Sequence, residues 1–183
     1  MREGMKLALT LMLISAAAGL GLSWVNGLTA GRIVKQQEER LNGSLAKAFP
    51  AGHYEKLDKA SSLRQREEFA TVEAIWKAAR PEGYVVSLAP RGYGGKLNCL
   101  VGITAAGTIR GVVVNQQNET PGLGSRVVED SFLSQFKGVK AGKLLAVKKD
   151  GGTIQAVSGA TVSSRALTRG VNTALAVFQE VSR

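Results

Sequence analysis

The chain begins with a long apolar run. The spacing of its apolar residues then changes, from one typical of helices to one typical of strands. Residues 7–25 contain no charged side chain. As a helix this run would be about 28 Å long, which matches the hydrocarbon core of a bilayer. Trp24 lies at its far end, where an interfacial aromatic residue is expected. We therefore predict one transmembrane helix over residues 7–27, preceded by a short tail at residues 1–6.

Two properties of this first segment stay open at the level of the sequence. A cleaved signal peptide is the alternative to an anchor, with residues 28–30 as a poor match to a cleavage site. We favour the anchor, because the apolar run is longer than a usual signal core. Basic residues lie on both sides of the run: Arg2 and Lys6 before it, and Arg32, Lys35 and Arg40 after it. The charge bias therefore does not decide on which side of a membrane the rest of the chain lies.

The next residues change from a helical to a polar pattern. Apolar residues recur every three or four positions over residues 33–49, which indicates an amphipathic helix, and Pro50 ends it. Residues 53–66 are mostly polar and predict a mobile or loosely packed connection. We accordingly assign residues 28–70 to a helical linker region.

From residue 71 the apolar residues alternate with polar ones, which is typical of half-buried strands. Residues 71–78 and 84–88 flank a Pro-Glu-Gly turn and predict one β-hairpin. Residues 97–104 and 108–115 predict a second hairpin, with many β-branched side chains. A glycine-rich loop at residues 92–95 lies between the two hairpins.

The last third of the chain mixes helices and strands. Residues 126–136 have the spacing of a short helix, and residues 144–147 and 153–157 resemble strands around a turn. A final helix follows residue 161, and one of its faces is apolar: Leu167, Val171, Ala174, Leu175, Phe178 and Val181. We predict an α+β fold in which helices pack on an antiparallel sheet, with residues 71–183 forming the domain.

Composition and charge narrow the possible functions. Hydrophobic residues make up 44% and charged residues 21%, which is ordinary for a globular protein. The net charge of +10 favours contact with anionic surfaces, but aromatic residues are only 5% and are not interleaved with a basic run, which argues against nucleic-acid binding. The single His53 has no cysteine partner nearby, so we expect no metal site. No catalytic dyad is expected either.

Residues 158–161, Ser-Gly-Ala-Thr, stand at the start of the final helix. The free amides and the positive end of the helix dipole form an anion site there. The hydroxyl of Thr161, held against a bound phosphate, could become a covalent attachment point. The alternative is a plain helix cap, which is the usual role of Ser and Thr at such positions.

Two more glycine-rich loops, at residues 92–95 and 119–124, accompany this motif. Glycine lets the backbone approach a ligand closely. Neither the spacing of a Walker loop nor that of a dinucleotide fingerprint is present. Each loop taken alone is as well explained as a turn.

The combination of Glu-Thr-Pro-Gly-Leu-Gly at residues 119–124 with Ser-Gly-Ala-Thr at residues 158–161 resembles the FMN-binding domain of the G subunit of Rnf complexes. The C subunit of the sodium-pumping NADH:quinone reductase is a relative of that family. The likeness extends to four further stretches: residues 92–95, 100–102, 148–152 and 164–166. It covers about half the chain, and the layout of one N-terminal span and one outer domain is also similar. Two separate motifs in the right order argue against chance similarity.

The resemblance implies a specific cofactor site. FMN would be held by a phosphoester bond to Thr161, with the amides of the following helix aimed at the phosphate. The other implied cofactor-binding residues are Ser158, Gly159, Ala160, Val162, Glu119, Thr120, Pro121, Gly122, Leu123 and Gly124. The family signature usually has an aspartate at the position of Gln155, which puts the efficiency of flavin attachment in question. Asp150 is a candidate substitute.

The resemblance also implies a location and partners. Members of the family lie in the inner membrane of bacterial cells, with the FMN domain on the outer side. The implied partners are the other members of the complex and a flavin transferase. We expect a subunit that relays electrons through FMN, in a complex that couples ferredoxin:NAD electron transfer to ion transport. The alternatives are a membrane-tethered flavin-binding sensor and an anchored domain without a cofactor.

A few single residues complete the expectations. Lys148 and Lys149 either form a solvated turn or face a phosphate or a partner. Tyr93 is expected to pack rather than to stack on a flavin. Cys99 and Trp76 are expected to lie in the core.

Overall fold

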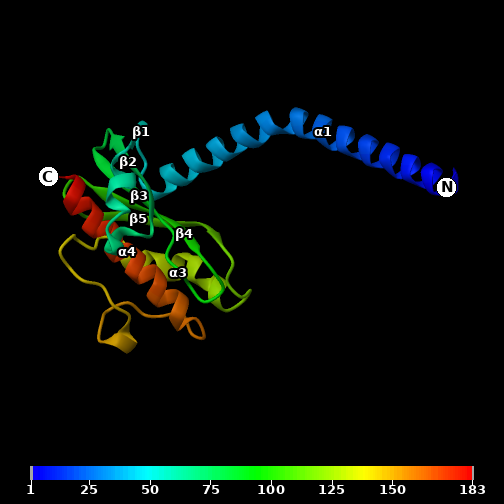
Figure 1. Cartoon of the computed structure of the whole chain (residues 1–183). Helices are drawn as coiled ribbons and strands as arrows, with labels where there is room; N and C mark the ends of the chain where they lie inside the picture. Colours follow the sequence, from blue (N-terminus) through cyan, green and yellow to red (C-terminus); the bar gives the residue numbers. More distant parts are fainter. Residues whose placement is uncertain (1, 183) are drawn as a thin grey trace. The chain divides into compact units, whose positions relative to one another are not determined.

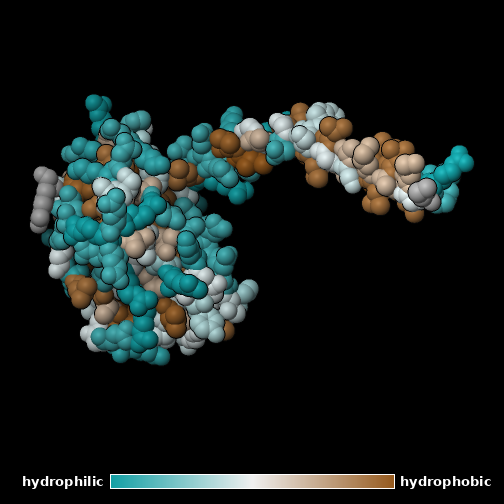
Figure 2. Space-filling view, viewed as in Figure 1, coloured by the Kyte–Doolittle hydropathy of each residue, from teal (hydrophilic) through white to brown (hydrophobic). Residues whose placement is uncertain are grey.

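The fold is described from a computed structural model, which covers residues 2–182 (Figure 1). The chain divides after Asn42 into two compact units, which are described separately. The first unit consists of helix α1, Arg2–Ala48, as far as Asn42. The rest of the helix belongs to the second unit. Its side chains are exposed before residue 44, and apolar ones dominate its first half (Figure 2). By length and composition α1 is able to cross a membrane.

The segments predicted as a span and as a separate amphipathic helix are joined in one helix. No residue between them breaks the hydrogen-bonded ladder: Gly27 and Gly31 are tolerated within it, and Pro50 is the first proline of the chain. Helix α1 ends at Ala48, next to the position predicted from Pro50.

A five-stranded antiparallel sheet forms the centre of the second unit. Its strands lie side by side in chain order and are listed with their bounds: β1 His53–Leu57, β2 Val72–Ala79, β3 Gly83–Leu88, β4 Leu97–Thr104 and β5 Ile109–Gln117. Both predicted hairpins, β2–β3 and β4–β5, are confirmed. Short loops between neighbouring antiparallel strands explain the simple order.

The prediction of a mobile connection at residues 53–66 is wrong. Strand β1 pairs with β2 along its whole length, from His53 opposite Ala79 to Leu57 opposite Ile75. Helix α2, Lys59–Leu63, and the 3₁₀ helix Glu67–Phe69 follow it. Strand β1 is polar because it is an edge strand with most of its side chains in solvent, so it lacks the alternation that marks the inner strands.

Helix α4, Thr161–Val181, packs on one face of the sheet (Figure 1). The apolar face predicted for it is confirmed, since all six of its predicted residues are buried. Gly170 sits in the middle of this helix at a close contact with Pro90, where a Cβ would come within 2.9 Å of the proline ring. The largest apolar cluster lies between α4 and the sheet and includes Cys99, as predicted.

The opposite face of the sheet holds the last turn of α1. Gly102 of β4 lies beside Gly111 of β5, and a Cβ on either would press on the carbonyl oxygen of Ala48. A Cβ on Gly83 would collide with the ring of Phe49. The three glycines thus form a groove for the chain at residues 48–49, and the predicted core residue Trp76 is buried in the same cluster.

The helix predicted over residues 126–136 is broken into three pieces. A 3₁₀ helix, Gly124–Val128, precedes helix α3, Asp130–Leu133, and a second 3₁₀ helix, Ser134–Phe136, follows. Glu129 separates the first two pieces because its backbone is extended, at φ −70° and ψ 144°. The apolar residues of this stretch still pack into the core, since Val127, Phe132 and Phe136 are buried.

The strands predicted at residues 144–147 and 153–157 are absent from the sheet. Within residues 2–182, the two segments pair with each other through one isolated parallel bridge, between Val147 and Ile154. Side-chain amides replace the missing strand partners. Asn172 of α4 accepts from the N–H of Leu145 at 2.9 Å and donates to its carbonyl at 2.8 Å. Gln135 makes the same two bonds with the backbone of Gln155, at 2.7 and 3.1 Å.

A methyl group in the glycine groove should destabilise the second unit. For Gly102→Ala we expect a loss of about 1–3 kcal/mol in the free energy of unfolding, because the new Cβ meets backbone rather than a flexible side chain. Gly52→Ala is the matched control, since nothing lies within 4 Å of a Cβ there. Chemical denaturation of the full chain in detergent measures both. Equal stability of the two variants would contradict the groove.

Replacing Asn172 by leucine should loosen the segment that it holds. The backbone N–H and carbonyl of the buried Leu145 then lose their partners, at a cost of about 1–3 kcal/mol for each group left unsatisfied. Faster amide hydrogen exchange at Leu145 is the expected signature. Gln179→Leu, an exposed position on the same helix, serves as the control and should leave that exchange rate unchanged.

Cys99 should be unreactive in the folded protein. Burial, with a smaller contribution from the Glu73 carboxylate, raises the pKa of the Cys99 thiol to about 12, so the thiol stays protonated at neutral pH. A disulfide reagent at about pH 8 should label Cys99 only after denaturation, when its pKa returns toward about 8.5. Complete labelling of the native chain would contradict this burial.

Candidate functional site

The three glycine-rich loops predicted from the sequence meet at one end of the sheet. Leu97 at the start of β4 pairs with Gln117 at the end of β5, so the loops at residues 92–95 and 119–124 lie next to each other. The start of α4 approaches the same place. Together they enclose a cavity of about 430 Å³, lined by Tyr93, Glu119, Thr120, Leu123, Gly124, Lys149, Gly159, Ala160, Thr161, Val162 and Ser163.

Thr161 is the first residue of α4, and its hydroxyl does not cap the helix. Ala160 occupies the N-cap position and offers no side-chain hydrogen bond. The first intrahelical bond runs from the Ser164 N–H to the Ala160 carbonyl at 2.9 Å. Within the described chain, the amides of Thr161, Val162 and Ser163 have no acceptor. The plain-cap interpretation is therefore wrong, and the start of α4 presents open donors at the cavity.

A lysine adds positive charge at this end of the cavity. The Nζ atom of Lys149 lies 3.5 Å from Oγ1 of Thr161. A short 3₁₀ turn, Lys148–Asp150, places it there, and Gly151 closes the turn in the left-handed region at φ 80°. Both lysines are exposed on this turn, and the Lys149 ammonium also faces the Thr161 hydroxyl, so the structure agrees with a solvated turn and leaves the phosphate contact as a prediction.

Asp150 is already engaged. Its carboxylate forms a bidentate pair with Arg165, with Nε donating to Oδ2 at 2.7 Å and Nη2 donating to Oδ1. The hydrogen bond from Arg165 holds the pKa of Asp150 below its usual value, and Arg169 adds a smaller Coulombic effect. The pair ties the lysine-bearing turn to α4.

Glu119 lies deeper in the site and is only 5% exposed. Its Oε2 accepts hydrogen bonds from the Gly94 amide at 3.2 Å and from the Ser163 hydroxyl at 2.8 Å. Its Oε1 is buried without a partner in the described chain. The carboxylate thus joins the loop at residues 92–95, its own loop and the first turn of α4.

Steric contacts explain the glycines around Glu119, and the sequence did not indicate these contacts. A Cβ at Gly92 would collide with Oε1 of Glu119, and a Cβ at Gly124 would lie 2.5 Å from Oε2. At Gly94 a Cβ would collide with the carbonyl of Asn118, the residue before Glu119. The carboxylate therefore leaves no room for a side chain at Gly92 and Gly124, and the backbone next to Glu119 leaves none at Gly94.

Exposed apolar side chains form the rim of the cavity. Tyr93 is 77% exposed, and Leu123 and Val162 are about half exposed. The prediction that Tyr93 packs in the protein is therefore wrong. A ring on a glycine-rich loop at the mouth of a cavity is available to a ligand instead.

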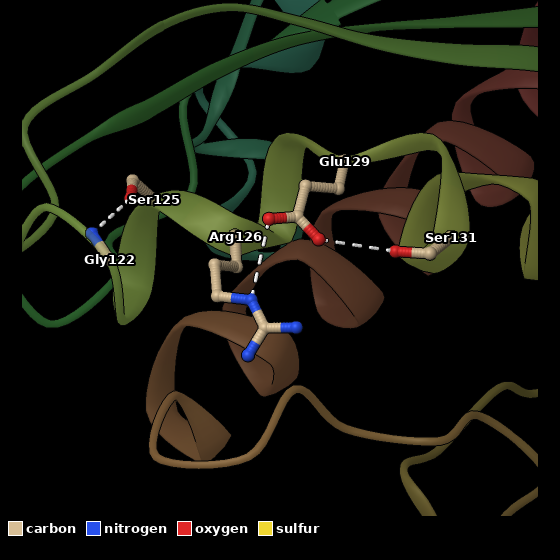
Figure 3. Close-up of polar contacts among 5 residues, drawn as sticks. All are labelled: Gly122, Ser125, Arg126, Glu129 and Ser131. Carbon is tan, nitrogen blue, oxygen red and sulfur yellow. Dashed lines mark hydrogen bonds and ion pairs between the residues drawn. The ribbon is translucent and has the colours of Figure 1, made fainter.

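Three of the predicted site residues do not line this cavity. Pro121 and Gly122 lie in the adjoining turn, where the Gly122 N–H donates to Oγ of Ser125 at 2.9 Å (Figure 3). Ser158 lines a second cavity of about 240 Å³, together with Gln155. Arg126 borders that second cavity, with Nε 3.3 Å from the Glu129 carboxylate (Figure 3).

The sequence did not assign Tyr93, Lys149 and Ser163 to the site. Tyr93 lies within a glycine-rich loop, and Ser163 follows the Ser-Gly-Ala-Thr motif by two residues, so both were close to recognised signals. Lys149 is separated from Thr161 by a turn whose path the sequence did not indicate. The site has positive donors at one end and apolar walls at its mouth, a combination that suits an organic phosphate such as FMN.

Comparison with known proteins agrees with this geometry. Residues 92–176 match the family described as FMN-binding domain. The G subunit of the Na⁺-translocating ferredoxin:NAD⁺ oxidoreductase complex of Acetobacterium woodii is 35% identical, over 97% of this chain and 93% of that protein. The G subunit of the ion-translocating oxidoreductase complex of Pseudomonas aeruginosa is 36% identical, over 89% of this chain and 83% of that protein.

A solved structure supports the fold. The structure of the C subunit of the Na⁺-translocating NADH-quinone reductase from Parabacteroides distasonis superposes with a TM-score of 0.53 at 20% identity. The superposition covers 78% of this chain and 96% of that one. Given the identity and coverage of the two relatives, this chain belongs to the G-subunit family of ion-translocating oxidoreductase (Rnf) complexes and contains an FMN-binding domain.

Proposed function

We propose that this protein is a membrane-anchored flavoprotein subunit that relays electrons through an FMN attached covalently to Thr161. The observation that carries the proposal is the position of the Thr161 hydroxyl at the N-terminus of α4, which has no side-chain cap. Nζ of Lys149 lies 3.5 Å from Oγ1 of Thr161. A phosphate bonded to Oγ1 of Thr161 would meet the open amides of the helix start and the lysine charge. The relatives' names make electron transfer in an ion-translocating complex the context.

The residues of the cavity divide the work of holding FMN. Gly159, Ala160 and Val162 surround Thr161 and would enclose the phosphate, while Thr120, Leu123 and Gly124 would line the ring system. Bound FMN can pass one or two electrons and so connects centres of different electron count. Ser158, Pro121 and Gly122 would act by shaping the two turns rather than by contact.

Attachment would form a bond between Oγ1 of Thr161 and the flavin phosphorus and break the phosphoanhydride bond of a flavin dinucleotide donor. The nucleoside monophosphate would leave and the hydroxyl proton would pass to a base of the catalyst, a flavin transferase. Gln155 stands where the family signature usually has an aspartate, and its side chain is exposed next to the second cavity. Asp150 is paired with Arg165 and is not free to take that role. The maturation enzyme would therefore have to work without a carboxylate at the position of Gln155.

The anchor completes the proposal. Residues 7–27 of α1 would span the inner membrane, with residues 1–6 in the cytoplasm and the FMN domain on the outer side. The domain is longer than the predicted residues 71–183, because β1, within the predicted linker at 28–70, is a strand of its sheet. A tether of this kind keeps the domain at high effective concentration near the other members of its complex. It also prevents loss of the cofactor carrier from the membrane.

The attachment residue is tested with the full chain purified from its own host. On a denaturing gel under ultraviolet light the wild type should fluoresce as a flavin, and Thr161→Ala should abolish the signal because the phosphoester oxygen is gone. Thr153→Ala, an exposed threonine in the same region, is the matched control and should remain fluorescent. A wild-type chain without fluorescence, or a fluorescent Thr161→Ala chain, would refute covalent attachment.

A second measurement separates a carrier from a flavin-binding sensor. A carrier should co-purify with an ion-pumping membrane complex, and its deletion should abolish ferredoxin:NAD electron traffic in membranes. Unchanged traffic after deletion would favour the sensor.

A further inference from the structure

Glu119 is a buried carboxyl side chain without a cationic partner in the described chain. No ion pair in the described chain includes it, although lysines and arginines lie nearby in the sequence. Two neutral donors, the Gly94 amide and the Ser163 hydroxyl, contact one of its oxygens, and the other oxygen has none. A buried carboxylate is costly unless it is fully hydrogen-bonded, so its retention calls for a function besides stability.

The position of Glu119 suggests that function. It lines the same cavity as Thr161 and Lys149. Glu119 is buried, whereas Thr161 is half-buried and Lys149 is exposed. Interactions between charges are weak in solvent and strong in a buried, low-dielectric place. The one charge shielded from water among the described residues of this cavity is therefore negative, while the positive charge of Lys149 is screened.

We propose that Glu119 sets the reduction potential of the bound flavin as a fixed negative charge beside it, and positions the loops that hold it. The inference rests on the proposed function, because it requires a flavin in the cavity. An electron added to the flavin brings negative charge close to the carboxylate, and the repulsion lowers the midpoint potential. The Ser163 hydroxyl opposes this effect, because its hydrogen bond partly neutralises Oε2.

Glu119 acts in this scheme as a positioning residue rather than a catalytic one. Its Oε1 faces Gly92 within the protein and is closed to solvent, so a direct bond to a ligand through that atom is not part of the proposal. The charge acts through space. The glycines at positions 92 and 124 are what allow it to sit there.

The test is spectroelectrochemical titration of the FMN-loaded full chain in detergent, with all variants measured at the same pH. Glu119→Gln keeps the volume and an acceptor but removes the charge, so the midpoint potential should shift to a more positive value. Glu129→Gln removes an exposed carboxylate that borders the second cavity and should leave the potential unchanged. An unchanged potential in Glu119→Gln, with flavin content equal to wild type, would overturn the inference.

For Ser163→Ala we expect a shift of the midpoint potential in the opposite direction. This variant also tests the inference if Glu119→Gln does not fold. It leaves the charge in place but removes a neutralising donor, so the potential should become more negative. A purely structural role for Glu119 predicts altered thermal stability of both variants without opposite shifts in potential. Absence of flavin from the wild type would instead count against the proposed function itself, so the two failures are distinguishable.

Discussion

The arrangement of the site depends on placing one carboxylate inside the protein. Glu119 needs donors because it is buried, and it finds them on two separate elements, the amide of Gly94 and the hydroxyl of Ser163. Its volume then excludes a Cβ at Gly92 and Gly124. The glycine-rich loops are thus a response to a charge, and their closeness to a ligand follows from that packing.

The sheet provides the frame on which this site is built. Its two faces are filled differently, by α4 on one side and by the chain at residues 48–49 in a glycine groove on the other. The register between Leu97 and Gln117 brings two of the loops together at one end of the sheet. The N-terminus of helix α4 lies at the same end, so the amides of Thr161 and its neighbours face the cavity without further support.

Much of this arrangement could be predicted where the sequence has a clear period. The alternation in β2 to β5 and the apolar face of α4 identified the central elements, and the two motifs identified most of the cavity wall. Prediction failed where tertiary contacts replace a local signal. Strand β1 is polar because it is an edge. Residues 144–147 and 153–157 have strand-like side chains but lie outside the sheet, where Asn172 and Gln135 pair with their backbone.

Those two amide side chains have a consequence for how the cavity wall is held in place. The segment that carries Lys149 is tied to the rest of the domain at Leu145 and Gln155 by side-chain hydrogen bonds, and at Asp150 by an exposed ion pair. None of these contacts belongs to the ladder of the sheet. The segment is therefore held by side-chain contacts and by Leu145, Val147 and Ile154, which are buried in the main apolar cluster. The position of Lys149 beside Thr161 thus depends on contacts that lie outside the sheet, so a change at Gln135 or Asn172 would reach the cavity without touching its lining.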